Sequence, residues 1–181
     1  MTRNIIFIGG IHGVGKSTLC TKISDFLDIE SYSASKLIKS VSNLEFPSDK
    51  KIKGINKNQD LLITAVEEYI NPDNYCLLDG HFCLLNQNGE VSDIPLTTFT
   101  NLSPAAIIVL TNEPNIIYNQ IKDRDGNEMN IENITSFQDR ELEHSKLVSQ
   151  TLNIPWITEN PVKGLPHIQS FISDMMGKNS K

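Results

Sequence analysis

Short runs of apolar residues alternate along the chain with segments in which apolar residues recur every three or four positions. The apolar runs span residues 5–8, 75–78, 105–110 and 154–157, and a further strand is predicted near residues 29–33. Helical spacing is found at Leu19, Ile23, Phe26 and Leu27, at Leu61, Leu62, Ala65, Val66, Tyr69 and Ile70, and at Leu165, Ile168, Ile172 and Met175. Strands that alternate with helices in this way predict a parallel sheet covered on both faces. Pro155 has no N–H to donate, so the last strand is expected at a sheet edge.

Composition and charge narrow the class of protein. With 181 residues, 39% hydrophobic and 21% charged, the chain has the length and composition of a single globular domain over residues 1–181. No apolar stretch approaches the roughly 20 residues that cross a bilayer, and the run at 5–8 is too short for a signal peptide. We therefore expect a cytoplasmic protein that does not bind membranes. The net charge of -6 also opposes binding to extended nucleic acid.

A glycine-rich turn follows the first predicted strand. Its sequence, GIHGVGKS at residues 10–17, fits the phosphate-binding pattern of glycine, four residues, glycine, lysine and serine. Glycines let backbone N–H groups surround an anion, and the following helix adds the positive end of its dipole. Lys16 is placed to reach the β- and γ-phosphates of ATP, and the Ser17 hydroxyl to bind Mg²⁺. The residues assigned to nucleotide binding are Gly10, His12, Gly13, Val14, Gly15, Lys16, Ser17 and Thr18.

The third predicted strand ends in a single carboxylate. Asp79, Gly80 and His81 lie at its carboxyl end, which is where open parallel sheets bind ligands. Asp79 is expected to orient Mg²⁺-bound water or to take a proton from an acceptor hydroxyl, whereas motor ATPases usually carry paired acidic residues here. Gly80 permits close approach of a second substrate, and His81 is expected to hydrogen-bond it. The alternative is that Asp79 only caps the turn and that His81 is structural.

A lid is predicted over residues 122–140. One helix begins near Pro114 and ends near Arg124, a polar turn with Gly126 as its hinge follows, and a second helix carries Arg140. Phosphoryl transfer needs positive charge around the transferring group, so both arginines are catalytic candidates. The alternative for each is an ordinary helical side chain, solvated or in an exposed ion pair.

Several of these segments together carry a resemblance to a known family. They are GIHGVGKST at residues 10–18, LLDGH at 77–81, NQNGEVSDIP at 86–95 and PAAIIVLTNEPNIIYNQIKDR at 104–124. The chain resembles nucleoside monophosphate kinases of the archaeal adenylate kinase type, together with the eukaryotic nuclear adenylate kinase-like proteins. This resemblance implies an α/β P-loop NTPase fold, a three-layer sandwich around a five-stranded parallel sheet in the order 2-3-1-4-5. It also implies a mobile lid and an acceptor-binding helical region, here residues 31–70.

The acceptor-binding helical region departs from that family. Its members usually carry a glycine-aspartate pair and an arginine that holds the acceptor phosphate, whereas this chain has Ser35 and Lys36 in place of the pair and Lys39 in place of the arginine. Lysine holds a phosphate as a point charge, without the bidentate fork of arginine. The resemblance thus adds Lys39 to Gly80 and His81 as residues assigned to the second substrate, with a solvated surface residue as the alternative for Lys39.

These observations predict an ATP- and Mg²⁺-dependent phosphotransferase whose acceptor is a nucleoside monophosphate. Catalysis is assigned to Lys16, Asp79, Arg124 and Arg140, and metal binding to Ser17 and Asp79. Two alternatives remain: a kinase of another small molecule, and a regulatory P-loop ATPase that acts on a protein partner. Acceptor-dependent loss of ATP distinguishes the kinases from the ATPase.

Overall fold

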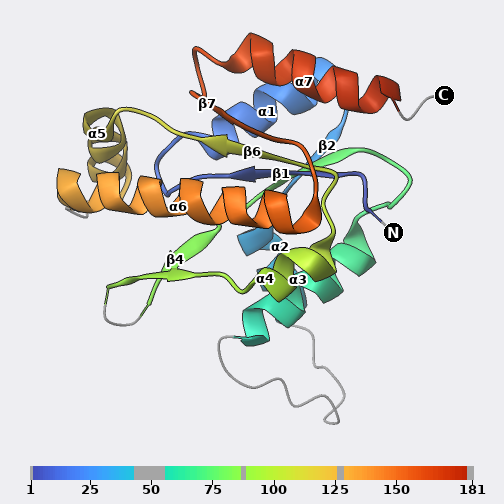
Figure 1. Cartoon of the computed structure of the whole chain (residues 1–181), viewed down its shortest axis with the longest axis horizontal. Helices are drawn as coiled ribbons and strands as arrows, with labels where there is room; N and C mark the ends of the chain where they lie inside the picture. The colour runs from blue at the N-terminus through green and yellow to red at the C-terminus, as the bar shows by residue number, and fades with distance from the viewer. Residues whose placement is uncertain (1, 43–55, 87–88, 126–128, 179–181) are drawn as a thin grey trace.

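A parallel five-stranded sheet forms the centre of the computed structural model, which describes residues 2–42, 56–86, 89–125 and 129–178 (Figure 1). Its strands are β1 (Ile5–Gly9), β2 (Glu30–Ser33), β3 (Cys76–Asp79), β6 (Ala106–Leu110) and β7 (Trp156–Glu159). They lie in the order β2-β3-β1-β6-β7, and each neighbouring pair is parallel. Because β4 (Cys83–Leu85) and β5 (Val91–Asp93) form a separate hairpin, the sheet strands counted alone have the predicted order 2-3-1-4-5.

Helices cover both faces of the sheet. On one face lie α1 (Lys16–Leu27) and α7 (Leu165–Lys178), and on the other lie α6 (Ile131–Leu152) and α4 (Leu96–Leu102) (Figure 1). The helix α2 (Ala34–Ser42) packs against α3 (Asn56–Tyr69), and α5 (Pro114–Asp125) packs against α6. The arrangement is the expected three-layer α/β sandwich, with the α2–α3 pair at one side.

The burial of the strands explains why continuous apolar runs in the sequence predict a sheet that is covered on both faces. Every residue of β1 and of β6 is buried, as continuous apolar strands at the centre of a covered sheet must be. At the edge, β7 begins just after Pro155, whose carbonyl accepts a hydrogen bond from the Ile107 N–H at 2.9 Å. The edge position of this strand is therefore confirmed, and proline is tolerated because only its carbonyl is needed.

Two residues that the helical pattern places on the apolar face are not buried. Phe26 is 64% exposed and Tyr69 is 43% exposed, whereas Leu19 and Ile23 are fully buried. Both exceptions lie in the last turn of their helices, at the margin of the core. Periodicity identifies the face of a helix, but how far the neighbouring layer extends along that face depends on tertiary packing.

Three phenylalanine rings form the floor beneath the carboxyl ends of the central strands. The ring centroids of Phe7 and Phe82 are 5.0 Å apart, those of Phe7 and Phe99 are 5.6 Å apart, and those of Phe82 and Phe99 are 4.9 Å apart. The cluster joins β1, the turn after β3 and α4. Edge and stacked contacts of this kind add to the stabilisation from burial. Because Phe82 directly follows His81 in the chain, the turn that carries His81 is anchored in the core.

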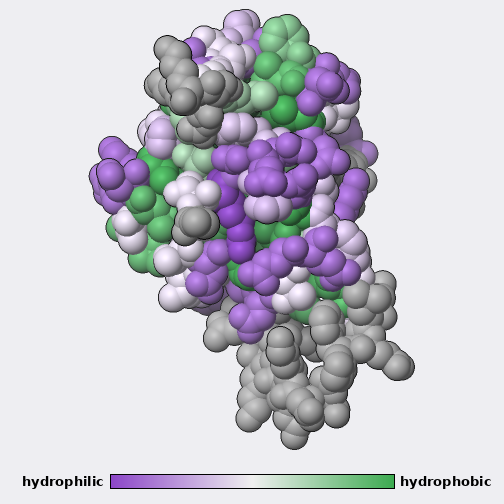
Figure 2. Space-filling view, turned by 90° about the vertical axis from the view of Figure 1, so that its right-hand side faces the viewer, coloured by the Kyte–Doolittle hydropathy of each residue, from purple (hydrophilic) through white to green (hydrophobic). Residues whose placement is uncertain are grey.

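The opposite end of the sheet, where the N-terminus lies, has a mainly hydrophilic surface (Figure 2). There the Arg3 guanidinium pairs with Glu67 at 3.1 Å and donates to the Asn101 carbonyl at 3.2 Å, while the Asn4 amide donates to the Pro72 carbonyl at 3.2 Å. In the part of the chain that is described, none of the helices combines the length and apolarity needed to cross a membrane.

We expect Phe99→Ala to lower the free energy of unfolding by about 3–5 kcal/mol, since the substitution removes a fully packed ring and leaves a cavity. The matched control is Phe26→Ala, which truncates an exposed ring and should change this free energy by less than about 0.5 kcal/mol. Urea unfolding of the two variants measures both values. Equal effects would contradict the placement of the aromatic core.

Candidate functional site

The turn between β1 and α1 has the backbone of an anion cradle. Gly10, Gly13 and Gly15 have positive φ values of 137°, 79° and 109°, in the region that favours glycine. A Cβ atom at Gly10 would also lie 2.7 Å from the Leu110 carbonyl oxygen. The turn leads directly into the N-terminus of α1, so its N–H groups and the helix dipole act on the same point.

Lys16 is held across this turn. Its ammonium donates hydrogen bonds to the carbonyls of Gly10 at 2.7 Å and Ile11 at 3.0 Å, and the residue is only 8% exposed. A buried ammonium needs such partners because desolvation of an unpaired charge is costly. The same contacts hold the Lys16 ammonium at the glycine-rich turn, so its positive charge is already in place before a phosphate binds.

A cavity of about 390 Å³, named here the loop cavity, opens above the turn. The residues that line it are His12, Gly13, Gly15, Lys16, Ser17, Thr18, Ser33, Ser35, Lys36, Asp79, His81 and Gln120. The structure thus brings together eight of the residues assigned from the sequence. The assignments did not include Lys36, which adds a second ammonium, or Gln120 on α5.

Asp79 reaches the loop cavity because β3 pairs with β1. In this pairing Asp79 stands opposite Ile8, two residues before the glycine-rich turn. Burial raises the pKa of the Asp79 carboxyl above its ordinary value, and the positive charges of Lys16, His81 and Lys36 oppose this rise. A partly buried carboxylate among cations is suited to accept a proton or to bind a metal.

The residues at this point fit a magnesium ion. The Ser17 hydroxyl and the Asp79 carboxylate line the same cavity, and oxygen donors of these two types are the ligands that Mg²⁺ prefers. Magnesium in nucleotide sites usually takes only one or two protein ligands, since phosphates and water supply the rest. Among the described residues, no group of three or more His, Cys, Asp or Glu side chains is placed to hold a metal ion.

A second cavity, of about 330 Å³ and named here the α2–α3 cavity, adjoins the first. Its floor is apolar and includes Phe7, Phe99 and Leu102, while Ser35, Lys39, Asn58, Gln59 and Thr98 bring polar groups to it. Lys39, Gly80 and His81, which the sequence assigns to a second substrate, all line this cavity. Asp79 lines both this cavity and the loop cavity, so its carboxylate stands at their junction.

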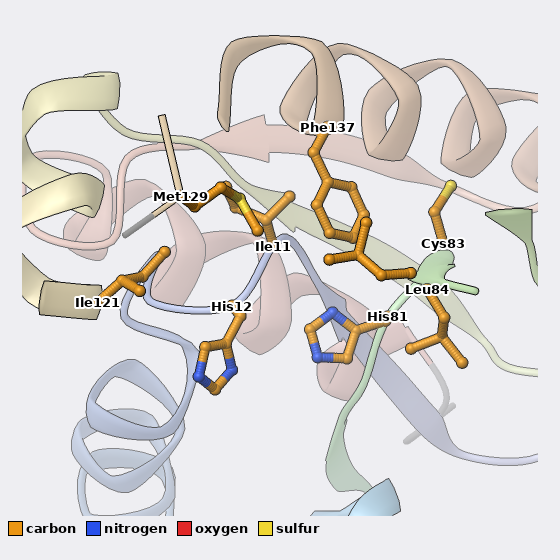
Figure 3. A pocket seen from close by; sticks show the side chains of 9 residues that line it. Ile11, His12, His81, Cys83, Leu84, Ile121, Met129 and Phe137 are labelled. Atoms are coloured by element: carbon orange, nitrogen blue, oxygen red, sulfur yellow. The ribbon is translucent and has the colours of Figure 1, made fainter. Parts of the chain in front are cut away.

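A third cavity, of about 390 Å³ and named here the hairpin cavity, lies between the glycine-rich turn, β4 and the α5–α6 pair (Figure 3). Figure 3 shows the apolar side chains of Ile11, Ile121, Met129, Phe137 and Leu84 around this cavity, together with the rings of His12 and His81. His81 lines all three cavities and is therefore the residue at which they converge.

Polar side chains on α6 hold the segments around these cavities. The Gln138 amide donates to the Asn112 carbonyl and accepts from the Asn112 N–H, both at 3.0 Å, which fixes the segment after β6. The Glu141 carboxylate accepts hydrogen bonds from the N–H groups of Phe82 and Cys83. His144 Nε2 lies 2.7 Å from the Ile94 carbonyl. These three residues could not be predicted from the sequence, because a buried polar position on a long helix has no distinctive local pattern.

Gly10, Val14 and Arg140 are not among the described residues that line the loop cavity. Gly10 belongs to the turn itself, and Val14 is fully buried beneath it, so Val14 can offer a ligand only its backbone. Arg140 forms ion pairs with Asp93 of β5 and, at 3.0 Å, with Glu143. This is the alternative that the sequence left open for Arg140, and it lowers the pKa of Asp93. Arg124 lies in the last turn of α5, but its side chain is outside the described part, as is Gly126.

Comparison with known proteins identifies the fold that carries this site. A family model described as an AAA domain matches residues 9–138. Shikimate kinase from Aquifex aeolicus superposes with a TM-score of 0.54 at 15% identity, over 97% of this chain and 98% of that chain. Shikimate kinase from Bacteroides thetaiotaomicron superposes with a TM-score of 0.57 at 13% identity, over 93% of this chain and 98% of that chain. A gluconokinase from Sinorhizobium meliloti superposes with a TM-score of 0.50 at 12% identity, over 93% of this chain and 94% of that chain. At these identities the likeness shows a shared P-loop kinase fold.

We expect Asp79→Asn to stabilise the fold at neutral pH. A raised folded-state pKa means that the folded protein binds this proton more readily than the unfolded chain, so the ionised carboxylate costs stability at neutral pH. The cost shrinks as the pH falls through the folded-state pKa. If Asp79→Asn raises the free energy of unfolding by about 1 kcal/mol, the melting temperature rises by about 2–4 °C.

Thermal unfolding at pH 7.5 and pH 5 measures this effect, with the exposed Asp25→Asn as the control. The gain from Asp79→Asn should be larger at pH 7.5 than at pH 5, and the control should show no gain at either pH. A lower melting temperature for Asp79→Asn at pH 7.5 would mean that the carboxylate stabilises the turn.

Proposed function

The chain belongs to the family described as an AAA domain, and from this premise we propose that it is an ATP-dependent phosphotransferase that acts on a small molecule. The observation that carries the proposal is the junction of two cavities at Asp79. One cavity has the features of a nucleotide phosphate site, with Lys16 and Ser17, and the other has a volume of about 330 Å³, within the range of small-molecule pockets. A hydrolase that only cleaves ATP has no need of the second cavity.

The proposed roles follow from this placement. The glycine-rich turn and Lys16 hold the donor phosphates, and Ser17 with Asp79 would hold Mg²⁺, which neutralises phosphate charge. An acceptor in the α2–α3 cavity presents its nucleophilic oxygen at the junction, and where that oxygen belongs to a hydroxyl group the Asp79 carboxylate takes its proton. Catalysis of phosphoryl transfer depends mostly on such positioning and on charge stabilisation, so few other groups are required.

The domain organisation of the proposal keeps the boundaries predicted from the sequence. Residues 1–181 form one kinase domain, residues 31–70 supply the acceptor-binding helical region, and residues 122–140 supply the lid. Support comes from α2, α3 and the ends of α5 and α6, which border the cavities. Residues 43–55 and 126–128, which belong to these two regions, lie outside the described part.

A nucleoside monophosphate remains the proposed acceptor. Lys39 lines the α2–α3 cavity, and its ammonium would pair with the phosphate of the acceptor. Asn58 and Gln59 line the same cavity, and their side-chain amides suit the polar edge of a base. The apolar floor with Phe7 and Phe99 offers a surface for the ring. The acceptor preference of an archaeal adenylate kinase type enzyme is thus compatible with the cavity.

A second candidate is a neutral compound with a hydroxyl group, such as a nucleoside. The observation in its favour is that Lys39 is the one basic side chain, histidine aside, among the described residues that line the α2–α3 cavity. A monophosphate carries up to two negative charges, and binding sites for it commonly use bidentate arginines. A mainly apolar cavity with one lysine also suits a neutral acceptor.

The test is ATP turnover with Mg²⁺ by the purified protein, alone and with each common nucleoside monophosphate and nucleoside, with direct identification of the products. We expect one acceptor to be phosphorylated in step with ADP formation. Lys16→Ala should lower this turnover by at least about 10²-fold, because a cation on the transferring phosphate is lost. Lys22→Ala, on the exposed side of α1, is the matched control and should leave turnover unchanged.

Different outcomes separate the candidates. A diphosphate product supports the monophosphate acceptor, and a monophosphate product supports the neutral acceptor. ATP hydrolysis that no acceptor changes would contradict phosphotransfer and favour a regulatory ATPase. In that case a partner protein should accelerate the hydrolysis.

We expect Arg124→Ala to lower kcat by roughly 10³ to 10⁵-fold while the Kd for ATP changes far less. The reason is that an arginine on the lid would act on the charge that develops in the transition state. Steady-state kinetics and ATP titration measure the two effects separately. A variant with normal turnover would exclude Arg124 from the site.

A further inference from the structure

Lys36 is a second lysine at the phosphate-binding end of the sheet. It lies in the first turn of α2, and the pairing of β2 with β3 sets Ser33, just before this helix, opposite Asp79. Lys16 and Lys36 are the two lysine or arginine residues among the described residues that line the loop cavity. Because they belong to α1 and α2, two helices bring positive charge to the same cavity.

The Lys36 ammonium acts on the carboxylate at the junction of the two cavities. Its positive charge opposes the rise in the pKa of the Asp79 carboxyl that burial causes, and Lys16 acts on the same carboxyl in the same direction. Asp79 is therefore within the electrostatic reach of both lysines. A phosphoryl group that passes over this carboxylate to an acceptor is within their reach as well.

The other basic side chains described near the predicted lid are engaged elsewhere. Arg140 is ion-paired with Asp93, and the Lys122 ammonium lies 5.9 Å from the centre of the Tyr118 ring on its own helix. Neither is among the described residues that line the loop cavity. Histidine aside, Lys36 is thus the described side chain that joins the lysine of the phosphate-binding turn in offering positive charge to a phosphate there.

Helix stability does not explain a lysine at this position. Lys36 is the third residue of α2, where the positive end of the helix dipole disfavours a cation. The residue is also exposed, so it adds no burial to the core. Positions at which a sequence departs from local preference without a structural gain are expected at functional sites. A bound anion in the loop cavity would offset the unfavourable charge.

We propose that Lys36 is a catalytic residue that binds the γ-phosphoryl group of ATP during its transfer. The proposal rests on the proposed phosphotransferase function and adds to it a source of positive charge on α2. Lys39, one turn further along the same helix, lines the α2–α3 cavity, whereas Lys36 lines the loop cavity. The two lysines therefore serve different substrates: Lys36 contacts the phosphate that is transferred, and Lys39 contacts the acceptor.

Lys36 takes part in the transfer without giving up a proton. The bond between the γ-phosphorus and the oxygen that bridges to the β-phosphorus breaks, and its electron pair leaves with ADP. A bond forms from the acceptor oxygen to the γ-phosphorus, and where that oxygen belongs to a hydroxyl group its proton moves to Asp79. The Lys36 ammonium keeps its three protons and donates to γ-phosphoryl oxygens in a charge-assisted hydrogen bond. This bond stabilises the negative charge on those oxygens in the transition state.

The first experiment measures nucleotide binding and requires no acceptor. Titration calorimetry with Mg²⁺ gives the Kd of ADP and the Kd of adenylyl imidodiphosphate, an ATP analogue whose γ-phosphate is not transferred. We expect Lys36→Met to weaken binding of the analogue by about 10-fold more than binding of ADP, because a charge-assisted hydrogen bond to the γ-phosphate is lost. Lys36→Arg, which keeps the charge, should recover most of this difference. Lys22→Met removes an exposed charge from α1 and is the matched control, which should leave the ratio of the two Kd values unchanged.

Equal effects of Lys36→Met on the two nucleotides would overturn the proposal, because a group that contacts the γ-phosphate must distinguish them. Thermal unfolding provides a second measurement. Since Lys36 opposes the dipole of α2, the melting temperature of Lys36→Met should be no lower than that of the wild type. A lower melting temperature together with equal losses for both nucleotides would assign Lys36 a structural role. A wild type that binds neither nucleotide would overturn both this proposal and the proposed function.

The second experiment separates the two substrates by steady-state kinetics. With the acceptor that the wild type phosphorylates, Lys36→Met should lower kcat by about 10²-fold and change the KM for the acceptor by less than about 3-fold, since the lost contact acts on the phosphoryl group in the transition state. A raised acceptor KM with a normal kcat would overturn the proposal, because it would place Lys36 at the acceptor. If the binding result is as expected but ATP is only hydrolysed with every acceptor, phosphotransfer fails while the contact of Lys36 with the γ-phosphate stands.

Discussion

The parallel pairing of β1 with β3 is the constraint on which the whole site depends. It sets Ile8 opposite Asp79 and joins the two strand ends through the hydrogen bond from the Gly80 N–H to the Ile8 carbonyl, at 3.0 Å. The glycine-rich turn and the Asp79 carboxylate, about 65 residues apart in the chain, are thereby brought to one edge of the sheet. A slip of one residue in this register would turn Asp79 toward the opposite face of the sheet.

The second structural requirement is the row of polar side chains on α6. Gln138, Glu141 and His144 are buried, and each is hydrogen-bonded to the backbone of a segment outside α6. Such groups contribute little net stability, since their desolvation offsets much of the hydrogen-bond energy. What they provide is a defined position for the turn after β3 and for the β4–β5 hairpin. The buried cluster of Phe7, Phe82 and Phe99 contributes hydrophobic stabilisation that offsets the cost of desolvating these polar groups.

Much of this arrangement follows from local sequence alone. Continuous apolar runs identify the strands, because a strand covered on both faces needs no polar positions, and the turn at Gly10 to Ser17 is recognisable because positive φ and close anion approach require glycine. Asp79 could be assigned because a carboxylate at the end of a buried strand has a defined place in a parallel sheet. Phe26 shares the helical spacing of Leu19 and Ile23 and yet is exposed, since the extent of the neighbouring layer is a tertiary property.

The amino-acid sequence by itself determined the order of elements, the phosphate-binding turn and the residue types around it. Only the tertiary structure decided which distant residues join them. Glu141 reaches His81, and Lys36 enters the loop cavity, through contacts between helices and strands that no local spacing encodes. Arg140 was a catalytic candidate from its charge, but its geometry pairs it with Asp93. The physical reason is that local propensity acts over a few residues, whereas the environment of a charged side chain is set by whatever the fold packs against it.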